Sequence, residues 1–88
     1  MSEAPTFCFF AAPPHGGGVV MEVSPPDAHG RIAFREWDTH AGESSATHGH
    51  LTAAELERRM RAWTHDGWTL GDSPERVLGW LKSNAPRH

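Results

Sequence analysis

The chain has 88 residues, a formal net charge of −3 and one cysteine, Cys8. This length allows one small domain, which we place over residues 1–88, and a lone cysteine excludes an internal disulfide. There are four tryptophans but only fourteen Leu, Ile, Val and Phe residues in total. Because the net charge is small, this composition predicts an ordered domain with a thin core rather than a disordered chain.

The charge is divided unevenly along the chain. With neutral histidines, residues 1–50 carry a net charge of −4 and residues 51–88 carry +1. Such a balance is poorly suited to binding a phosphate backbone. The chain also lacks an apolar run long enough to span a bilayer and the basic, apolar start of a signal peptide. We therefore expect a cytoplasmic protein without membrane contact.

The first half contains three segments with the composition of β-strands, at residues 6–11, 19–23 and 31–37. The first is apolar on both faces, which suits a strand that is covered on both sides or central in a sheet. Within it, Cys8 is expected to be a small buried hydrophobe. Short turns rich in proline and glycine separate the three segments, and such connections predict an antiparallel meander.

The third segment ends in a tryptophan whose direction is ambiguous. Strict alternation places Trp37 on the same side as Arg35, where the indole can stack on the guanidinium. Alternatively, a bulge near Glu36 returns Trp37 to the core. Residues 38–50 that follow have no apolar periodicity and are predicted to form a long loop.

The second half begins with a strongly marked helix at residues 53–66. Thr52 and Glu55 have the spacing of a capping box, in which each side chain bonds the other residue's backbone amide. A glycine follows the last turn, and the Trp63 and Trp68 side chains are placed to meet across this helix end. These independent signals make this helix the firmest structural prediction.

A second helix is predicted at residues 74–83. Ser73 is its N-cap and Pro74 its first residue, where a missing N–H costs nothing. Gly79 lies in the middle of this helix, which suggests that another element packs closely there. The short segment 68–70 can return to the sheet as an extended strand. The predicted fold is therefore α+β: a three-stranded antiparallel meander followed by two helices packed on one of its faces.

Seven histidines are the unusual feature of the composition. The alternation of His48 and His50 can place two imidazoles on one metal ion, and His40 lies in the same predicted loop. Zinc requires three or four ligands, and no further metal-binding motif supports the site. We expect no cofactor, and a metal site at these three histidines is kept as a second alternative.

No constellation in the sequence supports catalysis. Ser44 and Ser45 lie in the predicted loop, whereas a nucleophilic serine needs a rigid turn, a base and an oxyanion donor. We therefore predict that the protein is not an enzyme.

Nucleic-acid binding through the helical pair is the first alternative. The two helices together carry five cations, at Arg58, Arg59, Arg61, Arg76 and Lys82. However, the connector at residues 67–73 is longer than the turn of a helix-turn-helix motif, and glutamates dilute the basic strip. These features disfavour a nucleic-acid partner.

Two tryptophans suggest a different surface. Trp37 lies beside Arg35, and Trp80 lies at the edge of the apolar stripe of the second helix. Exposed tryptophan next to arginine is typical of protein-binding hot spots. We therefore expect a small non-enzymatic interaction or regulatory module that binds another protein or itself, with the homodimer as one form of that partnership.

Overall fold

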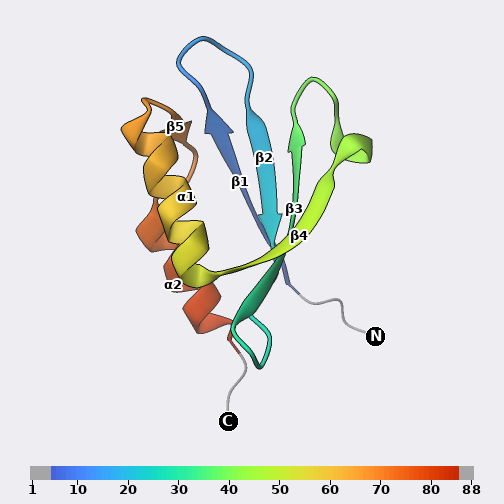
Figure 1. The fold of residues 1–88 in the computed structure, drawn as a ribbon, viewed down its shortest axis with the longest axis vertical. Coiled ribbons are helices and arrows are strands. Elements are labelled where there is room, and N and C mark those ends of the chain that lie inside the picture. The colour runs from blue at the N-terminus through green and yellow to red at the C-terminus, as the bar shows by residue number, and fades with distance from the viewer. Residues whose placement is uncertain (1–4, 86–88) are drawn as a thin grey trace.

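A computed structural model describes residues 5–85 of the chain. Five strands form one antiparallel sheet in the order β4-β3-β2-β1-β5, and both helices pack on the same face of it (Figure 1). The elements are β1 (Phe7–Ala12), β2 (Val19–Val23), β3 (Arg31–Asp38), the 3-10 turn η1 (Glu43–Ser45), β4 (Thr47–Thr52), α1 (Ala53–His65), β5 (Thr69–Leu70) and α2 (Pro74–Ser83). The predicted α+β class is confirmed, but the sheet has five strands where three were expected.

The fourth strand overturns part of the predicted loop. Residues 47–50, expected to be irregular, belong to β4 and pair with β3. Gly49 pairs with Phe34, and a Cβ added at Gly49 would lie 2.9 Å from the Phe34 ring. The aromatic ring therefore covers the glycine and supplies the packing that its own side chain lacks. The strand escapes sequence analysis because its own residues are mostly polar.

The core lies between the sheet and the helices. Side chains of β1, β2 and β3 that point to the helix face meet the inner sides of α1 and α2. The buried residues are Phe9, Met21, Val23, Ile32, Leu56, Met60, Val77 and Leu81. Because helices cover only this face, the opposite side of the sheet stays outside the core.

The predicted ends of α1 are confirmed. Thr52 Oγ1 accepts a hydrogen bond from the Glu55 amide at 3.1 Å, and the Thr52 amide donates to Glu55 Oε1 at 2.8 Å. After the helix, Gly67 has a φ of 87°, and the Trp68 amide donates to the Trp63 carbonyl at 2.9 Å. The two indole rings stack with their centroids 5.5 Å apart. Such a Schellman ending turns the chain back to the sheet, where β5 joins β1.

Candidate functional site

The sheet face opposite the helices carries no covering element among residues 5–85 (Figure 1). We call this surface the open face. The strand register places on it the side chains of Cys8, Phe10, Val20, Glu22, Ala33, Arg35, Trp37, His48 and His50. These residues form cross-strand rows, because paired residues in an antiparallel sheet point to the same side.

One row of the open face is apolar. Phe10 pairs with Val20, and Val20 pairs with Trp37. Phe10 is 39% exposed and is the most exposed large hydrophobic side chain among the residues described. The Arg35 guanidinium carbon lies 5.3 Å from the centroid of the Trp37 ring. The stacking predicted for this pair is therefore confirmed, and the alternative bulge at Glu36 is wrong because the pairing of β2 with β3 is continuous.

The neighbouring row is polar and runs from Cys8 through Glu22 and Arg35 to His48. Arg35 donates from Nε to Glu22 Oε1 at 2.9 Å and from Nη2 to Glu43 Oε1, on η1, at 2.6 Å. The hydrogen bond from Arg35 lowers the pKa of Glu22. One guanidinium is thus shared by two carboxylates, which leaves this part of the surface with a negative charge.

Cys8 differs from its predicted environment. It is exposed on the open face, not buried, because β1 is covered on one side only. Its Sγ lies 3.6 Å from Glu22 Oε2. Partial desolvation, followed by the charge of Glu22, raises the pKa of the thiol. A raised pKa disfavours the thiolate, so this cysteine lacks the activation of a catalytic nucleophile.

A hollow of about 440 Å³ lies at the β4 side of the open face. Its lining includes Glu22 of β2, Ser24 just after β2, Ala33 and Arg35 of β3, and His48 and His50 of β4. Both imidazoles therefore border one cavity. No element among the described residues covers this hollow, so a ligand can reach it from solvent.

The structure brings together two of the three histidines of the predicted metal site. His48 and His50 share the open face, while His40 lines a second hollow of about 580 Å³ with His15, Asp38 and Trp68. Among residues 5–85, no group of three or more His, Cys, Asp or Glu side chains is arranged to hold a metal ion.

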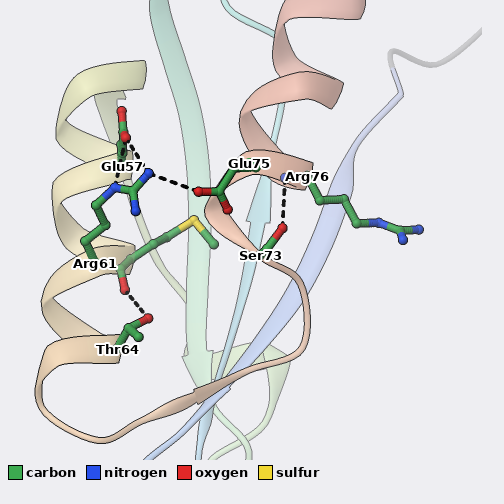
Figure 2. Close-up of polar contacts among 7 residues, drawn as sticks. Glu57, Arg61, Thr64, Ser73, Glu75 and Arg76 are labelled. Atoms are coloured by element: carbon green, nitrogen blue, oxygen red, sulfur yellow. Dashed lines mark hydrogen bonds and ion pairs between the residues drawn. The ribbon is translucent and has the colours of Figure 1, made fainter.

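The cations of the nucleic-acid alternative are largely occupied by carboxylates. Arg61 of α1 donates to Glu57 and reaches Glu75 at the start of α2, so it links the two helices (Figure 2). Two further arginines are paired, Arg59 with Glu36 and Arg76 with Asp72. Three of the five predicted contacts thus already have partners inside the chain.

Trp80 does not join the other two residues of the predicted interaction site. It lies on α2, in the helix layer, and its ring centroid is 5.4 Å from that of Phe7. It packs partly buried against the core, whereas Arg35 and Trp37 lie on the open face. The predicted site is therefore split between the two sides of the sheet.

Most of the apolar row could not be predicted from the sequence. Phe10 and Val20 join Trp37 only through the register of three strands. The apolar composition of both faces of β1 is the available signal, and it predicts a strand that is covered on both sides or central in the sheet; β1 is an interior strand between β2 and β5, but it is covered on one side only. An exposed apolar face produces the same pattern in the sequence.

The chain matches no protein-family model, no curated protein and no solved structure. Within residues 5–85, no helix has the length and apolar character needed to cross a membrane. The geometry of the open face is therefore the basis for a functional proposal.

Proposed function

We propose that the chain is a non-enzymatic protein-interaction module whose open face binds an apolar surface with a basic rim on a partner protein. The observation that carries this proposal is the uncovered row of Phe10, Val20 and Trp37 beside Arg35. Aromatic residues and arginine are enriched at the energetic centres of protein interfaces. A partner that covers this row removes its apolar area from water, which is the main driving force for association.

The charge around the row defines the partner further. Arg35 is already bonded to both Glu22 and Glu43, so the carboxylates outnumber it. The Glu43 side chain is 61% exposed, so the excess negative charge beside Arg35 faces solvent and can be reached by a partner. Lysine and arginine side chains around an apolar centre complement this field and speed the encounter. A nucleic acid is polyanionic and would be repelled by this charge.

Affinity capture from native cells tests the proposal with three baits: the natural chain, Trp37→Ser and Arg58→Ser. Arg58 is exposed on α1, in the helix layer, and serves as the matched surface control. Captured proteins that disappear with Trp37→Ser are then purified and titrated calorimetrically. We expect binding at least tenfold weaker for Trp37→Ser, unchanged for Arg58→Ser, and weaker for the natural chain at high salt. The proposal is contradicted if the natural chain captures no protein more strongly than Trp37→Ser does.

A further inference from the structure

We propose that the β4 strands of two copies pair antiparallel about Gly49, and that His48 and His50 of both copies together bind one Zn²⁺ ion. This inference goes beyond the proposed function and does not depend on it. The partner here is a second copy of the chain, and the ligand is a metal ion. Each copy alone supplies only half of the ligand set.

The direction of the backbone groups in β3 can be derived from one hydrogen bond. The Ser24 amide donates to the Ala33 carbonyl at 3.0 Å, so the main-chain groups of Ala33 point to the β2 side. In an antiparallel sheet, the N–H and C=O of one residue point the same way, and the direction alternates along the strand. The main-chain groups of Phe34 therefore point to β4, where its pairing partner is Gly49.

The same alternation fixes the outer edge of β4. Since the main-chain groups of Gly49 point to β3, those of His48 and His50 point away from the sheet. Thr52 is two residues after His50, so its main-chain groups should point the same way. Its amide does point away from β3, because it donates a hydrogen bond to the Glu55 carboxylate. Two N–H and two C=O groups are thus presented along the edge by His48 and His50.

This edge lacks the usual protection against strand pairing. Natural edge strands are commonly blunted by lysine, proline or a bulge, and β4 (Thr47–Thr52) has a regular register and neither residue type. The opposite edge of the sheet, β5, contains only two residues. Among residues 5–85, β4 is therefore the longer edge available for adding a strand.

The residues on the two sides of Gly49 are identical, which suits a two-fold axis at this glycine. Pairing about this axis sets His48 of each copy opposite His50 of the other, and the outward backbone groups form four hydrogen bonds. The glycines face each other as a non-hydrogen-bonded pair, where strands approach to about 4.5 Å between Cα atoms. The result is one continuous sheet of ten strands, twice the five of one chain.

The pairing gathers four imidazoles on one face of this sheet. Opposite Cβ atoms in an antiparallel pair lie about 4.5–5.5 Å apart, within reach of a shared ion for imidazole rings. Zn²⁺ takes four ligands in structural sites, and histidine nitrogen is among its preferred donors. The hollow of about 440 Å³ beside the histidines provides room. Arg35, opposite His48, does not repel the cation strongly because Glu22 and Glu43 neutralise it.

The test uses the full chain without a histidine tag. Molar mass is measured by light scattering with zinc chloride and with EDTA, and bound zinc by mass spectrometry. We expect a dimer with one zinc per two chains, and a monomer in EDTA. His48→Gln and His50→Gln should each lose both the zinc and the dimer, while His40→Gln, whose imidazole lines the other hollow, should retain both. Circular dichroism of each variant confirms that the fold is kept.

Three results would overturn the inference: a monomer in zinc, one zinc per chain, or a dimer that persists in His48→Gln. Trp37→Ser separates this inference from the proposed function. A zinc dimer that survives in Trp37→Ser while partner binding is lost supports both. Loss of the zinc dimer in His48→Gln with partner binding intact shows that the two surfaces act independently. The zinc-dimer and partner-binding experiments can therefore be interpreted separately, even if one of them gives a negative result.

Discussion

Arg59 of α1 donates from Nη2 to both carboxylate oxygens of Glu36 on β3, at 2.6 Å to Oε1. The same guanidinium lies 5.0 Å from the centroid of the Trp63 ring and 5.9 Å from that of Phe34. Glu36 points to the helix layer, among mostly apolar neighbours on its face of the sheet. A single cation thus joins α1 to the sheet by an ion pair with Glu36 and a contact with the Phe34 ring, and it also contacts Trp63 of its own helix.

Arg59→Ala should lower the free energy of unfolding by about 1–2 kcal/mol, because it removes a charged hydrogen bond and leaves Glu36 without a partner. The expected change in the free energy of unfolding is smaller than for a buried ion pair, because the Arg59 side chain is 35% exposed and solvent screens the interaction. Urea denaturation measures the change. Arg58→Ala on the same helix is the control and should change stability by less than about 0.5 kcal/mol. Equal effects of the two variants would show that the ion pair contributes nothing.

Gly79→Ala should stabilise the protein by roughly 0.5–1 kcal/mol, because alanine favours the helix and reduces the freedom of the unfolded chain. The close packing predicted at this glycine is absent: a Cβ there meets no atom within 4 Å. Thermal denaturation measures the gain. Gly49→Ala is the contrasting variant and should destabilise, since its Cβ would meet the Phe34 ring at 2.9 Å. A loss of stability in Gly79→Ala would contradict the described position of α2.

Alkylation of Cys8 should begin at a higher pH than alkylation of an unperturbed cysteine, because only the thiolate reacts. Partial desolvation and the charge of Glu22 both raise the pKa of this thiol. Glu22→Gln removes the second cause and releases Arg35, whose charge favours the thiolate. The variant should therefore shift the pH profile of the iodoacetamide reaction to lower pH. Glu57→Gln, which is distant from Cys8, is the control and should leave the pH profile unchanged. If Glu22→Gln also leaves the profile unchanged, Glu22 does not influence the pKa of the Cys8 thiol.

Glu22 should contribute to the loss of stability in acid. Its pKa is lowered in the folded protein, first by the hydrogen bond from Arg35, from an ordinary value of 4.5. The stabilisation is therefore present above pH 4.5 and is lost as the pH falls through the depressed folded value. Urea midpoints measured from pH 6 downwards should fall less steeply in Glu22→Gln than in the natural chain. Parallel curves for the two proteins would show that the Glu22 carboxylate does not contribute to the loss of stability in acid.

The helices were predictable because their signals are local. The capping box at Thr52 and the glycine ending at Gly67 depend only on neighbours in the sequence. They place α1 at residues 53–65, within one residue of the prediction. β4 was missed because its strand character comes from β3, which provides the hydrogen bonds and the ring of Phe34 over Gly49. No local pattern encodes that pairing.

The open face was predictable only in part, for the same reason. Arg35 and Trp37 are two residues apart in one strand, so alternation alone places them together. Their connection to Phe10 requires the register between β1, β2 and β3. Glu43 comes to Arg35 from η1, inside a segment without apolar periodicity. Neither the strand register nor the approach of η1 to β3 can be read from the spacing of residues.

The position of β5 has a consequence for the synthesis of the protein. Leu70 pairs with Ala11 and Thr69 with Ala12, so the outer edge of β1 is completed by a strand that is synthesised only after β2, β3, β4 and α1. Until that strand emerges, β1 presents an apolar segment with unpaired backbone groups. Such segments drive aggregation of incomplete chains. Truncation before residue 69 should therefore expose this edge of β1 and increase aggregation of the shortened chain.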